Sequence, residues 1–397
     1  GSVLATRASR PNRVAQPSSA PKLLFLVTED WYFCSHRLPV ARAARDAGFA
    51  VAVATRVRAH AEQIRGEGFA LHPLGWKRRG DGMVGQARAL AELVRLYRRE
   101  RPDLLYHVAL KPVLFGAAAA RLAFARRERP AMIAAIMGLG ASAGAAWRRA
   151  ALGRALRLAV GGARVIVQNP EDRAALAGFG VDPARIALIR GSGVDLAHFA
   201  ALPEPPVGGG VAAALVGRML RSKGVPEAAA ALRALRAQGE AVELVLAGGA
   251  DPDSRESLSE AEMRALGREP GIDWLGQVGD VREVWRRAAI ALAPSRYGEG
   301  VPKALIEAAA CGRAIIASDM PGCREVVIDG ATGLLVPPGD VAALAAAIAR
   351  LAADPALRRR LGAAARARVV AEFGEAAVAA QTTALLRAAL DERKGGR

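Results

Sequence analysis

Residues 295–312 read SRYGEGVPKALIEAAACG and predict more about this chain than any other stretch. The apolar run just before them, residues 289–293, predicts a buried strand. Pro302 suits the first position of a helix because its missing N–H has no intrahelical partner there. Gly312 suits the position where that helix ends. The segment therefore predicts a strand, a glycine-containing loop and a helix.

Two glutamates lie eight positions apart in this segment, Glu299 in the loop and Glu307 inside the helix. Glu307 stands among alanine, leucine and isoleucine, and a carboxylate in such an apolar wall needs hydrogen-bond donors to offset its burial. Sugar hydroxyls are suitable donors. The alternative is an i,i+4 ion pair between Lys303 and Glu307, which contributes only ~0.2–0.5 kcal/mol.

The spacing Glu-x7-Glu and its frame, Pro-Ser-x-x-x-Glu-Gly-x-Pro-x-x-x-x-Glu-Ala-x-Ala-x-Gly, resemble the retaining glycosyltransferases of family four. The likeness continues through residues 314–319, 321–325 and 329–340, and extends over nearly the whole chain. It implies an α/β protein of the GT-B class, in which two Rossmann-like domains with doubly wound parallel sheets face a cleft.

The length and pattern of the chain also predict two domains. Its 397 residues are enough for two cores, and short apolar strands alternate with alanine-rich helices, as in parallel α/β sheets. The expected strands cover residues 23–27, 50–54, 104–106, 132–136, 165–167, 212–216, 242–246, 290–293, 314–317 and 334–336.

A cluster of proline and glycine at residues 203–210 predicts the domain boundary near residue 207. We expect a disordered tail over 1–21, an acceptor-binding, membrane-facing domain over 22–206 and a nucleotide-sugar-binding domain over 207–375. The resemblance implies that a last helix, over 376–397, crosses back onto the first domain.

A second glycine-containing turn, residues 217–224 (GRMLRSKG), follows the strand expected at 212–216. Arg218 and Lys223 could converge on a diphosphate, Arg as a fork and Lys as a point charge. In the family that the chain resembles, the matching residues neutralise the leaving nucleoside diphosphate, which implies that no divalent metal is needed. Residues 251–253 (DPD) have the spacing of a metal motif, but we interpret them as a surface loop.

The resemblance also assigns the rest of the donor site. Glu299 would hold hydroxyls of the donor sugar, and Glu307 the ribose diol. The backbone near Gln277 and Val278 would hold the base, and the helix that begins near Pro302 would turn its positive end to the phosphates. The remaining predicted donor contacts are Gly217, Gly300, Val301 and Lys303.

The first domain is expected to hold the acceptor. Residues 28–39 (TEDWYFCSHRLP) resemble the branch that extends undecaprenyl-diphosphate-linked glycans for surface polysaccharides and glycoproteins. His36 and Arg37 could bind an acceptor diphosphate or hydroxyl; the alternative is a capped helix start with the arginine in solvent. His107 and Lys111 follow a strand end, where ligands bind in open α/β sheets, although a lone histidine there is often structural.

Many relatives place a donor-contacting histidine after the strand expected at 132–136, and this chain has Met137 and Gly138 there instead. We expect Gly138 and Gly140 to let backbone amides approach the ligand closely.

The charge of the chain is lopsided. Residues 1–200 carry 31 Lys plus Arg against 14 Asp plus Glu, and residues 201–397 carry 25 against 24. The first half therefore faces an anionic partner: nucleic acid, a membrane surface or a phosphorylated acceptor. Nucleic acid is the weakest of these because no nucleic-acid-binding signature is present.

A helix over 145–160 favours an anionic membrane surface, although its basic residues would also suit a solvated face. The predicted membrane contacts are Trp147, Arg148, Arg149, Arg154 and Arg157.

Three cysteines, Cys34, Cys311 and Cys323, have neither disulfide nor metal-ligand spacing and predict a reducing cytoplasm. No apolar run reaches the ~18 residues that a membrane span needs. We expect a protein at the inner face of the plasma membrane, with no cofactor, since the nucleotide sugar is a substrate.

Together with the resemblance, these residues predict retaining, metal-independent transfer of a hexose or N-acetylhexosamine, preferentially from a UDP-sugar, to a lipid-diphosphate-linked saccharide at the membrane. The resemblance also implies that a phosphate oxygen of the leaving group takes the acceptor proton. The alternatives are a GDP-sugar-dependent transferase on another acceptor, a GT-B UDP-sugar epimerase, and a catalytically silent membrane- or glycan-binding module.

Overall fold

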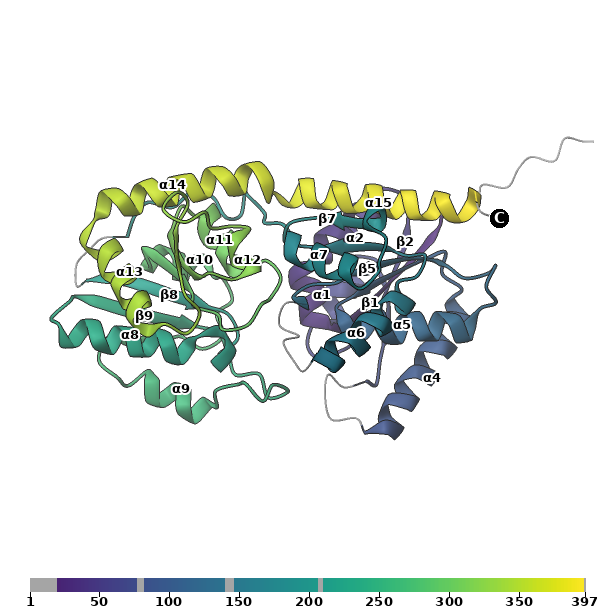
Figure 1. Cartoon of the computed structure of the whole chain (residues 1–397), viewed down its shortest axis with the longest axis horizontal. Coiled ribbons are helices and arrows are strands. Elements are labelled where there is room, and N and C mark those ends of the chain that lie inside the picture. Colours follow the sequence, from purple (N-terminus) through teal and green to yellow (C-terminus); the bar gives the residue numbers. More distant parts are fainter. Residues whose placement is uncertain (1–19, 77–81, 140–145, 206–209, 396–397) are drawn as a thin grey trace, which may run out of the picture.

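The computed structural model describes residues 20–76, 82–139, 146–205 and 210–395. Figure 1 shows two lobes, each with a parallel sheet between layers of helices. The boundary predicted near residue 207, most of the tail predicted over 1–21, and Gly140 lie outside the described residues.

The first lobe contains seven of the described strands and the helices between them. Its strands are β1 (Lys22–Glu29), β2 (Ala50–Arg56), β3 (Ala70–Pro73), β4 (Leu104–Val108), β5 (Ala131–Ala135), β6 (Arg164–Val167) and β7 (Ile186–Leu188). Its helices are α1 (Asp30–His36), α2 (Leu38–Asp46), α3 (Ala61–Gly66), α4 (Met83–Glu100), α5 (Leu110–Ala123), α6 (Ala146–Ala159) and α7 (Pro170–Gly178).

The second lobe contains six of the described strands. They are β8 (Val211–Val216), β9 (Val242–Ala247), β10 (Ile272–Trp274), β11 (Ile290–Ala293), β12 (Ala314–Ser318) and β13 (Leu334–Val336). Its helices are the short η3 (Arg221–Lys223), α8 (Val225–Ala237), α9 (Glu260–Leu266), α10 (Arg282–Arg287), α11 (Lys303–Ala310), α12 (Pro321–Arg324), α13 (Val341–Ala353) and α14 (Pro355–Glu372). The last helix of the chain, α15 (Glu375–Gly395), follows α14.

Both sheets have the same strand order. The first runs β3-β2-β1-β4-β5-β6-β7, the second runs β10-β9-β8-β11-β12-β13, and every pairing is parallel. The order reverses between β1 and β4 and again between β8 and β11. In open parallel sheets, ligands bind beyond the carboxyl ends of the strands at such a reversal. The predicted doubly wound architecture is confirmed, and each sheet has one expected binding edge.

Three strands were missed by the sequence analysis, and all three are edge strands. β3, β7 and β10 lie at the edges of their sheets, and each has only three or four residues. Central strands of a parallel sheet are buried on both faces and therefore give apolar runs; Leu23, Leu24 and Phe25 of β1 are fully buried. An edge strand such as β3 is half exposed and gives no such run.

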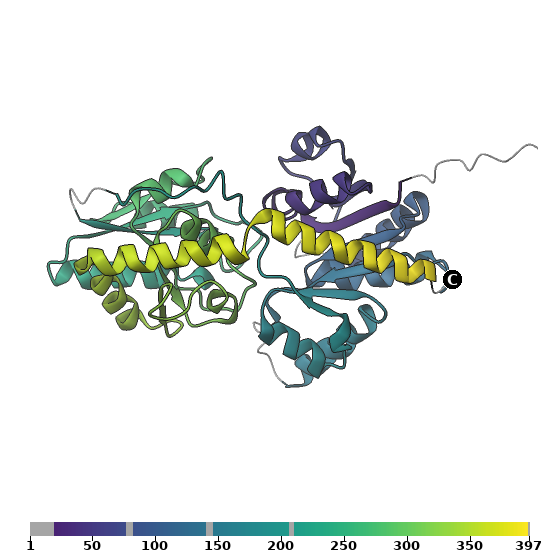
Figure 2. The same cartoon turned by 90° about the horizontal axis from the view of Figure 1, so that it is seen from above.

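The two lobes are joined by two chain segments that cross side by side. Val194 N donates to Phe373 O, and Glu375 N donates to Val194 O, both at 3.0 Å. Helix α15 then packs against α2, β4 and β5 of the first lobe, and Figure 2 shows α14 and α15 running along both lobes. Val378, Leu386 and Leu390 of α15 belong to the first lobe's core.

The predicted start of α11 needs a small correction. Pro302 has φ −66° and ψ 120°, so it is the N-cap and the helix begins at Lys303. Gly312 has φ +77°, in the left-handed region that a glycine after a helix end favours. Within the described residues, no helix is both long and apolar enough to cross a bilayer.

Candidate functional site

Two adjoining cavities of about 490 and 560 Å³ lie where the carboxyl ends of the two sheets face each other. We call them the first and the second cavity. Residues of both lobes line them, and Trp31, Gly217, Arg218 and Lys303 line both. The volumes fall within the usual range for small-molecule sites, which is roughly 300–1,000 Å³.

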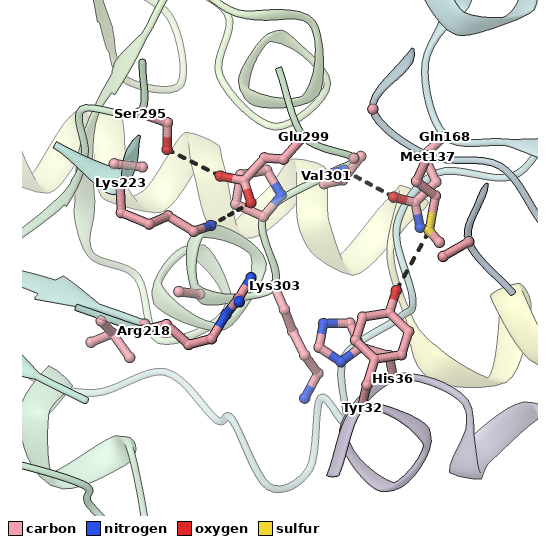
Figure 3. Close-up of a pocket in the computed structure, with 18 of the residues that line it drawn as sticks. Tyr32, His36, Met137, Gln168, Arg218, Lys223, Ser295, Glu299, Val301 and Lys303 are labelled. Carbon is pink, nitrogen blue, oxygen red and sulfur yellow. Dashed lines mark hydrogen bonds and ion pairs between the residues drawn. The ribbon is translucent and has the colours of Figure 1, made fainter. Parts of the chain in front are cut away.

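The first cavity brings together two predicted catalytic residues. Lys223 Nζ forms an ion pair with Glu299 Oε2, and Ser295 Oγ donates to Glu299 Oε1 at 3.0 Å. Figure 3 shows both charged side chains on the wall formed by the second lobe. The hydroxyl and the ammonium hold the carboxylate of Glu299 in one orientation, with part of its surface still exposed to the cavity.

Arg218 follows β8 and lies between the two cavities. Its Nη1 is 2.5 Å from Asp251 Oδ2, and its guanidinium carbon is 5.7 Å from the ring centroid of Trp31, which belongs to the first lobe. This corrects the interpretation of residues 251–253 as a surface loop: Asp251 is half-buried and lines the second cavity. Since β9 ends at Ala247, the loop lies at the binding edge of the sheet.

Asp253, in the same loop, contacts the first lobe. Its Oδ2 is 2.9 Å from Arg56 Nη1 and also pairs with Arg58 Nη2. The same two arginines pair with Glu29, which is 3% exposed. Burial raises the pKa of Glu29, although Arg56 and Arg58 oppose that rise. Charged groups of both lobes thus close one side of the second cavity.

Glu307 lines the second cavity from α11. It is 7% exposed, and its Oε1 accepts from Lys303 Nζ at 2.8 Å, so the i,i+4 ion pair weighed above is present. Burial raises its pKa, with Lys303 acting in the opposite direction. Gln277 and Val278 line the same cavity, so three of the residues predicted to hold a nucleoside lie together.

Close backbone approach explains two glycines of the site. A Cβ on Gly300 would lie 2.1 Å from Oε1 of Gln168, which accepts from Val301 N at 3.0 Å. Gly138 has φ +74°, and its Cβ position lies 3.2 Å from Cα of Glu299. The loop that carries Glu299 therefore rests directly on the first lobe. Gly138, Gly300, Val301 and Pro302 all line the first cavity.

Of the acceptor residues predicted near the start of the first lobe, His36 lines the first cavity and Arg37 does not. Arg37 is 3% exposed, and its Nη2 lies 3.1 Å from Met137 Sδ. The alternative of an arginine in solvent is therefore wrong. Figure 3 shows His36 and Tyr32 across the cavity from Lys223 and Glu299.

The prediction that His107 contacts a ligand is corrected by its position. His107 is fully buried in β4, and its Nε2 lies 2.9 Å from Tyr97 Oη. Burial lowers the pKa of His107 to about 3. The Lys111 ammonium lies over the rings of Trp76 and Phe115 and is not among the residues that line either cavity.

Three buried polar residues of the first lobe were missed by the sequence analysis. Gln168 holds Val301, as described above. Asp172 accepts from the backbone N–H groups of Gly138 at 2.8 Å and Leu139 at 2.9 Å. Asp30 accepts from backbone N–H groups of residues 58, 59 and 60. Each one fixes a loop at the cleft, and the signal for Asp30 and Asp172 was an acidic residue in a helical first turn.

The predicted membrane helix is α6. Trp147 is 68% exposed and Leu158 is 71% exposed, while Leu156 is buried against the first lobe. The four arginines predicted on this helix, Arg148, Arg149, Arg154 and Arg157, are exposed. The helix thus presents aromatic, aliphatic and basic side chains to the surroundings.

Comparison with known proteins follows the division into lobes. Residues 22–160 match the family model "Glycosyl transferase 4-like", and residues 211–354 match "Glycosyl transferases group 1". The crystal structure of HepE from Anabaena in complex with UDP and glucose is similar with a TM-score of 0.75 and 20% identity, over 92% of this chain and 99% of that one. The chain has the GT-B fold.

Two curated relatives cover parts of this GT-B chain. The alpha-maltose-1-phosphate synthase of Mycobacterium tuberculosis is 36% identical over 207 residues, which is 49% of this chain and 51% of that protein. The phosphatidyl-myo-inositol mannosyltransferase of Mycobacterium leprae is 37% identical over 142 residues, 35% of this chain and 36% of that protein. The chain thus spans about half, or less, of the length of these relatives. Both lobes thus match glycosyltransferase family models, and parts of the chain are similar to parts of glycosyltransferases.

Proposed function

We propose that this chain is a retaining glycosyltransferase that moves a hexose or N-acetylhexosamine from a nucleotide sugar, preferentially a UDP-sugar, to a lipid-diphosphate-linked saccharide. One observation carries the donor half of the proposal. Arg218, Lys223, Glu299, Lys303 and Glu307 converge on two joined cavities between the domains. Cations, which could hold a diphosphate, and carboxylates, which could accept from hydroxyls, thus line the same pair of cavities.

The donor would lie across both cavities. Glu307 would accept hydrogen bonds from the ribose diol, next to the base near Gln277 and Val278. Arg218 and Lys223 would hold the diphosphate, whose negative charge would compete with Asp251 for Arg218. Glu299, held by Ser295 and Lys223, would accept hydrogen bonds from hydroxyls of the sugar.

The reaction would form a bond from the acceptor oxygen to the anomeric carbon while the bond from that carbon to the diphosphate breaks. The electron pair of the broken bond leaves with the nucleoside diphosphate. A phosphate oxygen takes the acceptor proton on the same face, which retains the configuration. Arg218 and Lys223 would stabilise the charge that develops on the leaving group, and each such group typically contributes a few kcal/mol. This charge set supports a metal-independent mechanism.

The lipid-linked acceptor is supported by the surface of the first domain. Its α6 exposes Trp147 and Leu158 beside four arginines, a combination that suits a helix in the membrane interface. Met83 and Val84, at the start of α4, are also exposed, at 90% and 67%. The mannosyltransferase from M. leprae has a lipid, phosphatidyl-myo-inositol, in its name. We propose peripheral attachment at the inner face of the plasma membrane.

Thermal unfolding with a panel of UDP-, GDP-, ADP- and TDP-sugars tests the donor, because a ligand raises the midpoint only if it binds the folded state. We expect the largest shift with a UDP-sugar, and release of UDP that persists in EDTA. Loss of UDP release in EDTA that Mg²⁺ or Mn²⁺ restores would contradict the metal-independent mechanism. No shift with any donor would contradict the proposed function.

An epimerase is the second candidate, and one observation favours it. Glu29 is a buried carboxyl with a raised pKa that lines both cavities, as a general acid would. An epimerase would convert the nucleotide sugar in the absence of any acceptor, without net release of UDP. Analysis of the sugar by NMR after incubation with the protein alone separates the two activities.

A further inference from the structure

His36, the last residue of α1, presents one edge of its imidazole ring to the first cavity. The ring stacks on Tyr32, with centroids 4.2 Å apart and planes 9° apart, as Figure 3 shows. Its Nδ1 lies 2.6 Å from Oγ of the preceding residue, Ser35. The hydrogen bonds of the described residues include none to Nε2 of His36. One ring nitrogen is thus engaged by the protein, and the other is left for a ligand.

The contacts of Ser35 favour one position for the proton of the His36 ring. Ser35 Oγ lies 3.4 Å from the carbonyl oxygen of Tyr32, which can only accept. A hydroxyl has one hydrogen, and of its two contacts that with the carbonyl is the one in which Ser35 can only be the donor. If the hydroxyl donates to the carbonyl, Nδ1 of His36 donates to Ser35 Oγ. In a neutral imidazole this leaves Nε2 without a hydrogen and able to accept.

The charges around His36 favour the same arrangement. Four cations on separate elements lower the pKa of the ring: Arg37 at the start of α2, and Lys303 on α11, Lys223 in η3 and Arg218 after β8, each of the last three paired with a carboxylate. Burial and these cations hold the pKa of His36 well below its usual value, so the imidazole is neutral at physiological pH. The bare nitrogen is the negative end of a neutral imidazole, and it faces cations more favourably than an N–H would.

We propose that Ser35 fixes His36 in the tautomer whose bare Nε2 accepts a hydrogen bond from a sugar hydroxyl, and that this part of the cleft therefore binds a hydroxyl and not a phosphate. An acceptor nitrogen repels a phosphate oxygen, whereas a hydroxyl can donate to it. The hydroxyl belongs to the donor hexose or to the acceptor saccharide. The inference rests on the proposed function, and it makes Ser35 a positioning residue.

The tautomer is measured directly by NMR of protein labelled with ¹⁵N-histidine. The chain has five histidines, so the spectrum of His36→Gln assigns the missing signals. We expect an unprotonated Nε2 and a protonated Nδ1 that persist from pH 8 down through the usual range of histidine titration. In Ser35→Ala, signals of both tautomers are expected. A protonated Nε2 in the wild type would overturn the proposal, whatever the protein's activity.

Kinetics test the role of the nitrogen. The amide of Gln reaches the position of Nε2, whereas that of Asn reaches only the position of Nδ1. We expect His36→Asn to lower kcat/KM for transfer about tenfold, the loss of one hydrogen bond to substrate, and His36→Gln to lower it only about twofold. His72→Asn and His72→Gln are matched controls, because His72 is a half-buried histidine on β3 that lines neither cavity. Equal losses in the two His36 variants would contradict an acceptor at Nε2.

A double-mutant cycle separates positioning from general damage. Ser35→Ala should lower kcat/KM about threefold in the wild type, as expected for the loss of one modest hydrogen bond, and not at all in His36→Gln, because coupled residues are not additive. Ser35→Thr retains the hydroxyl and should restore activity. If Ser35→Ala lowers kcat/KM equally in the wild type and in His36→Gln, Ser35 does not act through His36. That result would contradict the proposal.

Two assays identify the source of the hydroxyl. One follows UDP release from the best UDP-sugar alone, and the other follows transfer to farnesyl-diphosphate-linked N-acetylglucosamine. If the hydroxyl belongs to the donor, His36→Asn should raise the donor KM in both assays. If it belongs to the acceptor, His36→Asn should affect the transfer assay only. If the wild-type protein has no activity in either assay, the proposed function is contradicted. The NMR measurement would still determine the tautomer of His36.

Discussion

Both domains meet the cleft with residues that follow several strands, namely β8, β9, β10 and β11 in the second domain and β1, β2, β4, β5 and β6 in the first, but the two sides differ in the chemistry of their side chains. On the second domain, charged side chains face the cavities and are already paired, as Lys223 with Glu299 is. On the first domain, aromatic rings, His36, Gln168 and the backbone at Gly138 line the first cavity, and its charged groups, Glu29 and Arg58, lie on the side of the second. Its buried polar residues, such as Asp172, hold loops in place.

This difference separates two ways to build a binding wall. In the proposed function, the charged side chains of the second domain would hold the diphosphate and the ribose of the donor. The wall formed by the first domain carries fewer such charges, and tertiary contacts such as that between Gln168 and Val301 hold it against the second domain. The following experiments test whether the walls differ in this way, from the largest expected effect to the smallest.

The largest expected effect is on binding to membranes, which should involve the first domain and not the second. Replacement of Arg148, Arg149, Arg154 and Arg157 by Gln should weaken binding to phosphatidylglycerol vesicles at low salt, because each basic residue near such a surface contributes roughly 1 kcal/mol. Co-sedimentation measures the binding, which should fall as salt rises and be absent with neutral vesicles.

The matched control replaces four exposed arginines of the second domain, Arg264, Arg268, Arg286 and Arg287, by Gln. This variant should bind vesicles as the wild type does. Equal loss in both variants would mean that total charge, and not α6, governs attachment. If the α6 variant binds vesicles as the wild type does, the four arginines of α6 only form a solvated surface and do not contact the membrane.

Removal of a cation from the proposed diphosphate site should have the next largest effect. Arg218→Ala and Lys223→Ala should each reduce kcat about a hundredfold, as the loss of one preorganised transition-state contact does. Donor affinity should change less. Arg221→Ala is the control: Arg221 lies in η3 beside Lys223, but its side chain is exposed and pairs with Glu262. Wild-type turnover in both test variants would exclude these residues from the site.

Glu307→Gln should weaken UDP binding about tenfold, because a hydrogen bond to a charged acceptor contributes roughly 1.5–3 kcal/mol. Since burial raises the pKa of Glu307, the carboxylate is present above that raised pKa, and affinity should be lost as pH falls through it. Calorimetry between pH 8 and 5 measures both effects. Glu260→Gln, in an exposed i,i+4 pair with Arg264, should leave affinity and its pH dependence unchanged.

The smallest expected effect on catalysis is that of His107, which we place in the core. His107→Leu leaves the buried Tyr97 hydroxyl unpaired and should lower the free energy of unfolding by about 1–3 kcal/mol, with kcat unchanged. Tyr97→Phe combined with His107→Leu should recover part of this loss. Urea unfolding measures the stability of both variants. A fall in kcat/KM for the acceptor at unchanged stability would instead indicate that His107 contacts the acceptor.

The pH dependence gives a second test of His107. Its pKa of about 3 in the folded protein lies below the ordinary value of 6.5. The neutral imidazole therefore contributes stability above pH 6.5, and this contribution is lost as pH falls from 6.5 toward 3. The stability difference between wild type and His107→Leu should narrow over that window.

The sequence predicted the cavity-lining residues of the second domain better than those of the first for a physical reason. Residues 299–307 form one loop and one helix, so their spacing along the chain determines their spacing in space. His107 lies on a strand, where neighbouring side chains point to opposite faces, and its position near the strand end did not show that it points into the core. Asp251 follows a strand that was correctly predicted, but its ion pair with Arg218 joins separate segments. Edge strands such as β3 were missed because half exposure removes the apolar pattern.

The path of α15 has a consequence for the synthesis of this protein. Strands β1 to β7 are made first, yet Val378, Leu386 and Leu390 of α15 belong to their core. The ribosome must therefore translate the entire second domain before the first core can be completed. At 5–20 residues per second this delay lasts on the order of 10–40 seconds. During that time the apolar surface that α15 will cover on β4 and β5 is open to chaperones, and the domain that is translated first finishes folding last.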